Sequence, residues 1–233
     1  MLDISFEERA KDLLKQVKQA QDRSPYGQKV TVCAATKTRT PEEINRLPEM
    51  GIHTIGENRV QELLEKYEQL DKEKLNIHFI GALQTNKVKY IIDKVCMIQS
   101  VDRLSLAQEI DRQAKKHGLI MDILCEINIG NEATKSGVSP EEAPSFVQEL
   151  MEFSNLRVCG LMCIPPVCDK KEEQKKYFKK IMEIFIDITH KNMDNSIMRI
   201  LSFGMSGDFE TAIECGSTMI RPGVALFGPR NYQ

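Results

Sequence analysis

The sequence has neither an excess of basic residues nor a long apolar run. Its 233 residues carry 32 Lys and Arg against 34 Asp and Glu, for a formal net charge of −2. This balance argues against a surface that binds nucleic acid through its phosphates. The apolar runs are far too short to cross a bilayer, and the opening MLDISFEERAKDLLKQ lacks the apolar core of a secretory signal. We therefore expect no nucleic-acid partner and no membrane contact.

The common phosphate and metal motifs are also missing. The sequence contains no Walker A motif and no G-x-G-x-x-G. Its seven cysteines are an odd number scattered along the chain, which is typical of free thiols in a reducing cytoplasm. Cys159, Cys163 and Cys168 lack a fourth ligand, and the four histidines are far apart. We expect a cytoplasmic protein without a metal site.

The sequence does contain a repeated alternation of short apolar runs and charged amphipathic stretches. The apolar runs predict strands at 30–36, 52–56, 76–81, 95–100, 121–129, 156–163, 198–204 and 217–223. The other stretches predict helices at 3–21, 41–49, 57–69, 84–92, 103–117, 140–153, 171–191 and 207–215. This alternation favours an α/β fold, a closed (β/α)8 TIM barrel with an extra N-terminal helix, over an open doubly wound sheet. We expect residues 1–233 to form a single domain.

In both of these folds the chemistry takes place where the strands end. The predicted ends are rich in Gly, Ser, Asn and Thr, which suits an anionic ligand. The densest group lies in residues 202–228, where Gly204, Ser206 and Gly207 precede a predicted helix and Arg221 follows the last strand. Small residues before a helix expose backbone N–H groups to an anion. This block predicts a phosphate site, with two ordinary capped connections as the alternative.

Lys37 directly follows the apolar strand VTVCAAT. A lysine at a strand end usually extends its ammonium group into solvent. A lysine that is partly desolvated near other cations has a depressed pKa, and its free amine can form a Schiff base with an aldehyde. The residues alone leave three interpretations open: a solvated lysine, a Schiff-base lysine for a phosphate-bearing aldehyde, and the base of a sugar-phosphate enzyme.

Five segments, taken together, resemble a known family. They are VCAATKTRTPEEI, GIHTIGENRVQEL, IHFIGALQTNKVKY, INIGNEATKSGV and LSFGMSGDFETAIECGSTMIRPGVALFG, in this order. Over nearly its whole length the sequence is similar to the pyridoxal phosphate homeostasis proteins (the YggS/PROSC family). The resemblance implies a fold type III-like barrel, similar to the N-terminal domain of alanine racemase. It also implies that pyridoxal 5′-phosphate (PLP) is bound as an internal aldimine.

The resemblance further implies roles for individual residues. Lys37 matches the Schiff-base lysine, Asn58 the residue beside the pyridine ring and its 3-hydroxyl, and Arg221 the arginine that faces the pyridine nitrogen. Met205 matches a residue that covers one face of the ring. The pocket wall matches His78, Ile80 and Gly81, and the blocks that hold the phosphate match Ser206, Gly207, Ser217, Thr218, Gly223 and Val224.

The implied function is intracellular PLP homeostasis, in which the protein binds PLP reversibly, buffers its aldehyde and delivers it to apo-enzymes. The alternative is a PLP-dependent amino-acid racemase with a reduced site. Racemisation needs proton donors on both faces of the α-carbon, and Lys37 is the one candidate. An arginine at the ring nitrogen discourages protonation there and so weakens the ring as an electron sink.

The length of the chain also favours a carrier. It ends soon after the last predicted strand, which leaves no room for the second domain of the racemases and its dimer contacts. We therefore expect a monomer without catalytic residues. Lys135, in the segment NEATKSG, is the second candidate amine.

Overall fold

The computed structural model describes residues 5–168, 170–191 and 198–229. Its strands are β1 (Thr31–Ala35), β2 (Thr54–Glu57), β3 (Asn76–Phe79), β4 (Met97–Val101), β5 (Met121–Ile127), β6 (Leu156–Cys163), β7 (Ile200–Ser202) and β8 (Met219–Ile220). They pair in parallel in chain order, and β8 pairs with β1 to close the barrel. The predicted TIM barrel is confirmed, and the open doubly wound sheet is wrong.

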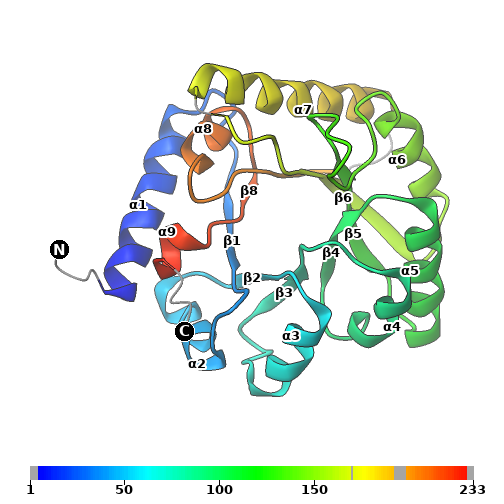
Figure 1. Cartoon of the computed structure of the whole chain (residues 1–233), viewed down its shortest axis with the longest axis horizontal. Coiled ribbons are helices and arrows are strands. Elements are labelled where there is room, and N and C mark those ends of the chain that lie inside the picture. The colour runs from blue at the N-terminus through cyan, green and yellow to red at the C-terminus, as the bar shows by residue number, and fades with distance from the viewer. Residues whose placement is uncertain (1–4, 169, 192–197, 230–233) are drawn as a thin grey trace.

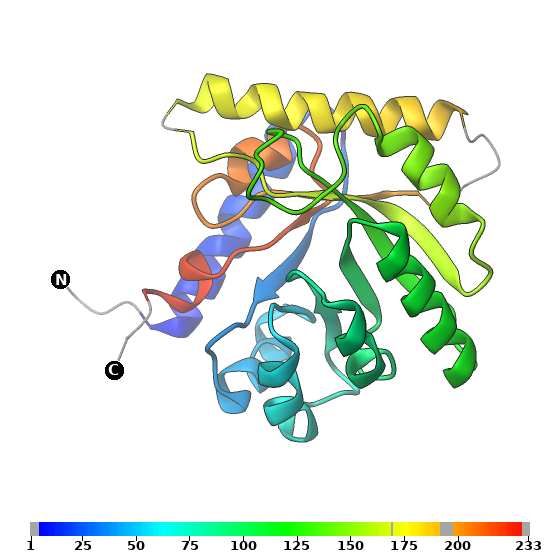
Figure 2. The ribbon, with the colours of Figure 1, turned by 45° about the vertical axis from the view of Figure 1, so that its right-hand side comes forward.

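The helices surround this ring of strands (Figure 1), and the oblique view shows the longest of them, α7, lying across one side (Figure 2). They are α1 (Phe6–Arg23), α2 (Pro41–Asn45), α3 (Val60–Lys66), α4 (Val88–Ile91), α5 (Leu104–His117), α6 (Ala143–Met151), α7 (Lys171–Lys191), α8 (Phe209–Glu214) and α9 (Val224–Phe227). Short 3-10 turns η1 (Pro48–Met50), η2 (Tyr67–Gln69) and η3 (Thr85–Lys87) extend or precede three of them. The short α9 was not expected from the sequence.

The helix predicted at 140–153 begins later than expected, at Ala143. The Ser139 hydroxyl accepts a hydrogen bond from the Glu142 N–H, and the Glu142 carboxylate accepts one from the Ser139 N–H. These reciprocal bonds resemble a capping box, but the residues between them form a turn before the helix starts. The capping residues predicted from the sequence are therefore present, but a turn separates them from the first residue of the helix.

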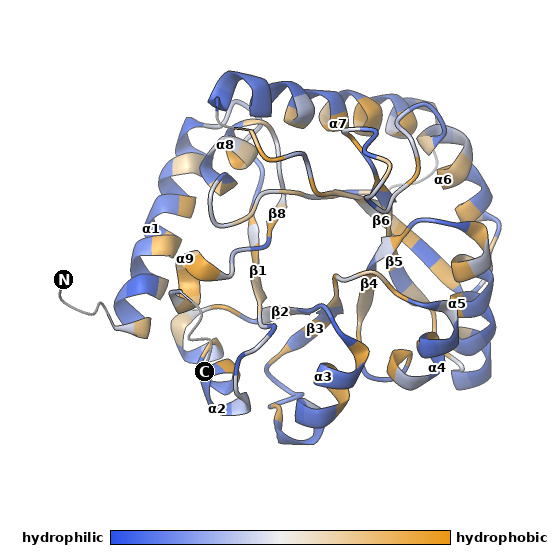
Figure 3. Cartoon of the chain, in the orientation of Figure 1, coloured by the Kyte–Doolittle hydropathy of each residue, from blue (hydrophilic) through white to orange (hydrophobic). Residues whose placement is uncertain are grey.

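Helix α1 precedes the barrel and packs against α8 and α9. Ser5 and Glu8 form a capping box at its start, which satisfies two backbone N–H groups of the first turn. Its buried residues recur at helical spacing and are Ala10, Leu13, Val17 and Ala20. Figure 3 shows the same pattern on the outer helices, which are mainly hydrophilic with hydrophobic bands. The extra helix predicted at 3–21 is thus present, although residues 3 and 4 lie outside the described residues.

Side chains of each strand alternate between the barrel interior and the layer under the helices. In β5, Leu124 packs with Met97 and Met162 inside the barrel, whereas Cys125 belongs to the larger core outside it. By this alternation Glu126 faces the interior at the carboxyl end of β5. In β1, Cys33 belongs to an interior cluster, and Lys37 lies in the turn that follows the carboxyl end of this strand.

The described residues contain no membrane-spanning helix, no metal-binding cluster and no disulfide. In it, no helix combines the length and the apolar character needed to cross a bilayer. Within the same ranges, no cluster of His, Cys, Asp and Glu side chains could hold a metal ion. All seven cysteines lie in these ranges, and no disulfide joins them.

Candidate functional site

The chain turns sharply at the carboxyl end of β1, where Lys37 is half-buried. Thr38, the next residue, has a φ of 66°, in the left-handed region that β-branched residues rarely adopt. The backbone N–H of Thr38 donates to the carboxylate of Glu62 in α3. This contact holds the turn in a strained conformation and so fixes where the Lys37 side chain begins.

A buried ion pair lies directly beneath this turn. Lys66 Nζ, at the end of α3, donates to Glu57 Oε1 (2.8 Å), Glu62 Oε1 (2.9 Å) and the Thr36 carbonyl (3.0 Å). The Thr36 hydroxyl also donates to Glu57 Oε1 (2.6 Å). Burial raises the pKa of Glu57, and the Lys66 ammonium opposes that rise. The cluster therefore connects the end of β1, the end of β2 and α3 around the base of Lys37.

Next to β1 on its β8 side, Ser206 connects the loop after β7 to the start of α9. Its Oγ accepts from the backbone N–H groups of Gly223 (3.0 Å) and Ala225 (3.1 Å). A serine hydroxyl has two acceptor lone pairs and one proton, so the proton remains for another acceptor. In the described residues, the N–H groups of Ser206, Gly207 and Val224 have no hydrogen-bond partner. These donors suit an anion.

The glycines of this side leave room for such an anion. A Cβ atom at Gly207 would meet nothing within 4 Å, and one at Gly223 would meet only Ala35, at 3.7 Å. Met205 and Val224 are exposed beside them, at 39% and 52%. The predicted residues Met205, Ser206, Gly207, Gly223 and Val224 are thus brought together at one edge of the barrel.

Arg221 follows β8 and is buried, at 4% exposure. Its Nη1 donates to the carbonyl and the hydroxyl of Ser202, and its Nη2 donates to the Cys163 carbonyl (2.9 Å). Burial lowers its pKa from the usual value, although a guanidinium stays charged in proteins. Three of its five N–H donors are engaged, so Nε–H and one Nη2–H remain for a ligand.

A chain of hydrogen bonds runs from Arg221 across the barrel interior. The Ser202 hydroxyl donates to Gln99 Oε1 (2.7 Å), and Gln99 Nε2 lies 2.9 Å from His78 Nδ1. Because an amide nitrogen is a donor, His78 Nδ1 accepts and its proton resides on Nε2. Burial lowers the pKa of His78 to about 4, so the ring is neutral. This chain holds Arg221 and His78 in fixed orientations.

A cavity of about 230 Å³ lies on the side of β2, β3 and β5, which we call the ring-side cavity. Its lining is Asn58, Ile80, Gly81, Ala82, Glu126, Lys135, Ser136 and Ile164. Gly81 is required there, because a Cβ atom would lie 2.1 Å from the Asn58 carbonyl oxygen. Asn58 Oδ1 is buried and has no hydrogen-bond partner among the described residues. The predicted ring and wall residues Asn58, Ile80 and Gly81 therefore line one cavity.

Glu126 is the charged residue that the cavity adds to the prediction. It is 7% exposed, and burial, reinforced by the nearby charge of Asp102, raises its pKa to about 7. The Arg221 guanidinium opposes this rise but donates no hydrogen bond to it. Lys135, in the same lining, pairs with Glu132 and donates to the Pro165 carbonyl (3.2 Å).

Two predicted residues are not part of this arrangement. The Thr218 carbonyl accepts from the N–H of Thr31, the first residue of β1, so Thr218 lies at the amino end of the barrel. Its Oγ1 accepts from the Leu201 N–H, and the fully buried Ser217 hydroxyl lies 2.7 Å from the Phe203 carbonyl. Both side chains serve the backbone of β7 and β8. We correct the predicted phosphate set by removing Ser217 and Thr218.

Sequence reasoning missed the buried polar groups around the site. Lys66 lies three residues after Leu63 and six after Val60, on the buried side of α3, so its helical spacing was an available signal. Glu126 was a charge within an otherwise apolar strand, at a position that faces the barrel interior. Gln99 and Ser202 gave no such signal, because uncharged polar residues are common in strands.

The similarity to known proteins agrees with this geometry. The family model of the alanine racemase N-terminal domain matches residues 10–231. A pyridoxal phosphate homeostasis protein of Aquifex aeolicus (strain VF5) is 43% identical over 226 residues, which cover 97% of this chain and 98% of that protein. The chain belongs to the family of pyridoxal phosphate homeostasis proteins.

Solved structures support the same family and fold. PipY of Synechococcus elongatus PCC7942, solved with PLP bound, has a TM-score of 0.83 and 26% identity, with 96% of this chain and 100% of that chain covered. Alanine racemase of Clostridium difficile 630, in complex with cycloserine, has a TM-score of 0.76 and 17% identity; the match covers 97% of this chain and 61% of that chain. The racemase therefore shares the barrel fold.

The site of this homeostasis-family chain fits PLP on its own geometry. Ser206 and the neighbouring N–H groups suit a phosphate, and open space at Gly207 and Gly223 admits it. Asn58 presents a buried amide without a partner, and Arg221 keeps two N–H donors. Lys37 begins at the same edge of the barrel. These donors and the amine are what a phosphorylated aldehyde with a heteroaromatic ring requires.

Proposed function

We propose that this chain holds PLP through a covalent bond between Lys37 Nζ and the aldehyde carbon, and that it serves in PLP homeostasis as a reversible carrier. When bound, the cofactor supplies an electrophilic aldehyde that condenses with a primary amine and releases one water. The observation that carries the proposal is Ser206. It joins the β7 loop to the start of α9 and keeps one hydroxyl proton for an anion, at the same barrel edge as Lys37.

The residues around Lys37 prepare its amine for this bond. The buried Lys66–Glu57 pair fixes the end of β1, and the Glu62 contact at Thr38 fixes the turn after it. Lys37 needs a neutral amine to attack a carbonyl carbon.

The remaining residues bind and orient. Ser206, Gly207, Gly223 and Val224 hold the phosphate through hydroxyl and backbone contacts. Arg221, fixed by Ser202 and Cys163, donates to the ring nitrogen and keeps a proton off it. Asn58 lies beside the ring hydroxyl, His78, Ile80 and Gly81 form the wall, and Met205 covers one face.

This assignment favours a carrier over a catalyst. An arginine at the ring nitrogen weakens the ring as an electron sink, and the curated relative named above is a homeostasis protein. We further propose that residues 1–233 act as a single domain, that the protein is a cytoplasmic monomer, and that apo-enzymes that require PLP are its transient partners.

Absorption spectra of the purified protein mixed with PLP test the proposal. Wild type gains the visible band of a conjugated imine, Lys37→Ala lacks it, and Lys135→Ala, the matched control, retains it. An unchanged band in Lys37→Ala would contradict the assignment of the linkage. Sustained racemisation of several amino acids by wild type would contradict the carrier role.

A further inference from the structure

Glu126 lines the ring-side cavity but has no part in the proposed function. Glu126 is only 7% exposed, and no described residue donates a hydrogen bond to its carboxyl group. A buried carboxylate without donors is unfavourable unless it takes up a proton or a partner binds it. A group that is retained in this state at the edge of a cavity indicates a donor that comes from outside the chain.

The cations nearest to Glu126 do not meet this need. Arg221 directs its hydrogen bonds to Ser202 and to the Cys163 carbonyl. Lys135 lines the same cavity, but its ammonium binds the Glu132 carboxylate and the Pro165 carbonyl. Glu126 is buried as a residue on β5, and it lines the ring-side cavity.

We propose that the ring-side cavity binds the ammonium group of a small primary amine, with Glu126 as its carboxylate partner. The proposal deepens the carrier function and rests on it, because a primary amine is the class of molecule that competes with Lys37 for an aldehyde. The cavity of about 230 Å³ has room for such a molecule, since one water occupies about 30 Å³ of the liquid. Asn58, Ile80 and Gly81 form the wall that the cavity shares with the cofactor site.

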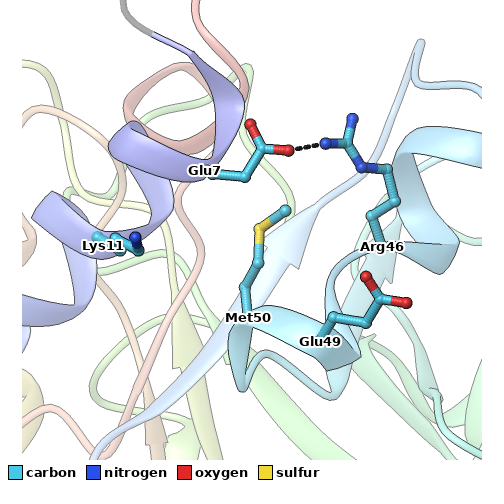
Figure 4. A pocket seen from close by; sticks show the side chains of 5 residues that line it. All are labelled: Glu7, Lys11, Arg46, Glu49 and Met50. Atoms are coloured by element: carbon cyan, nitrogen blue, oxygen red, sulfur yellow. Dashed lines mark ion pairs between the residues drawn. The ribbon is translucent and has the colours of Figure 1, made fainter.

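A second cavity of the molecule contains no buried carboxylate without a partner. It lies between α1 and η1, measures about 390 Å³ and is lined by Glu7, Lys11, Arg46, Glu49 and Met50 (Figure 4). There the Glu7 carboxylate pairs with Arg46, and Glu49 is exposed to water. Its carboxylates are paired or solvated, so the larger hollow calls for no cation.

Ligand-observed NMR titrations test the proposal with propylamine and propanol, which differ in the ammonium group. Wild type binds propylamine about tenfold more tightly than propanol, as expected for one charge-assisted hydrogen bond. Because a primary amine also reacts with an aldehyde, the titration is repeated with trimethylamine, an isomer whose nitrogen cannot form an imine. Trimethylamine keeps the preference over propanol.

Two variants locate the effect. Glu126→Gln removes the charge at nearly constant shape and abolishes the preference for both amines, whereas Glu49→Gln, the matched control in the other hollow, retains it. Equal binding of amine and alcohol by wild type, or an undiminished preference in Glu126→Gln, would overturn the proposal. The imine band of Lys37 reports the proposed function separately, because Glu126→Gln retains that band.

Discussion

The two sides of the barrel mouth differ in how their polar groups are satisfied. On the side of β7 and β8, Ser206 holds two backbone N–H groups and Arg221 binds Ser202 and the Cys163 carbonyl. The groups left without a partner among the described residues of this side are donors, the N–H groups of Ser206, Gly207 and Val224. On the side of β2 to β5, buried acceptors have no hydrogen-bond partner among the described residues. These atoms are Glu57 Oε2, Asn58 Oδ1 and Ser100 Oγ. The carboxyl group of Glu126 lines the ring-side cavity and also accepts no hydrogen bond from a described residue.

This difference separates a part of the site that is built in advance from a part that is completed on binding. Groups that are already hydrogen-bonded position a ligand without reorganisation. Groups that are buried without partners destabilise the unliganded fold and gain the most when a ligand supplies donors. We infer that the β7 and β8 side anchors the phosphate and that the β2 to β5 side determines what is bound next to it.

The largest expected effect comes from the buried ion pair beneath Lys37. Lys66→Met leaves the fully buried Glu57 without its main donor, and loss of one partner of a buried pair costs about 3–5 kcal/mol of unfolding free energy. Urea denaturation measures this cost. Glu57 takes up a proton to limit it, because burial already raises the pKa of Glu57.

Lys72→Met is the matched control for this substitution. Lys72 pairs with Glu68 on the surface, where the side chains are 41% and 82% exposed, and solvent screens such a pair. Its unfolding curve should superimpose on that of wild type. If Lys66→Met were equally harmless, the pair would not stabilise the end of β1.

A smaller effect is expected from pH. Because burial raises the pKa of Glu126 from 4.5 to about 7, the folded protein binds this proton more tightly than the unfolded chain. The group therefore lowers the unfolding free energy as pH rises from 4.5 to 7, by about 3 kcal/mol in total. The difference between wild type and Glu126→Gln should show this slope, since His78 titrates equally in both proteins. Parallel curves would contradict the shift.

The smallest effect concerns the anchoring side. Ser206→Ala removes the acceptor of two backbone N–H groups and the hydroxyl donor to the phosphate, which weakens PLP binding about tenfold to a hundredfold. Ser217→Ala, the matched control, removes a hydroxyl at the amino end of the barrel. It lowers thermal stability and leaves PLP affinity unchanged. Equal losses of affinity, measured by spectroscopic titration, would restore Ser217 to the phosphate set.

The sequence predicted long elements well and short ones poorly. The bounds of β6 and α7 were predicted as they are observed, because a long apolar run or a long amphipathic stretch averages over many residues. In contrast, β8 comprises only Met219–Ile220 where 217–223 was expected. A two-residue strand depends on its neighbours in the closed barrel, which one segment does not encode.

The same limit applies to the site. Ser206 and Arg221 could be predicted because they stand in short blocks of distinctive composition next to strand ends. The partners of Lys66 could not, because its ion pair with Glu57 joins the end of α3 to the end of β2 only after the helix packs on the barrel. Ser217 was included because its block matches one that holds the phosphate in the resembling family, and a block match does not show to which end of the strand a hydroxyl is directed.

The most direct test of the central claim is to fix the linkage chemically. Borohydride adds hydride to a C=N bond and converts it to a stable secondary amine, so treatment of the PLP-loaded protein traps the attached lysine for peptide mapping by mass spectrometry. We expect a single modified peptide, which carries the adduct at Lys37. An adduct at Lys135, or no adduct in protein that retains bound PLP, would contradict it.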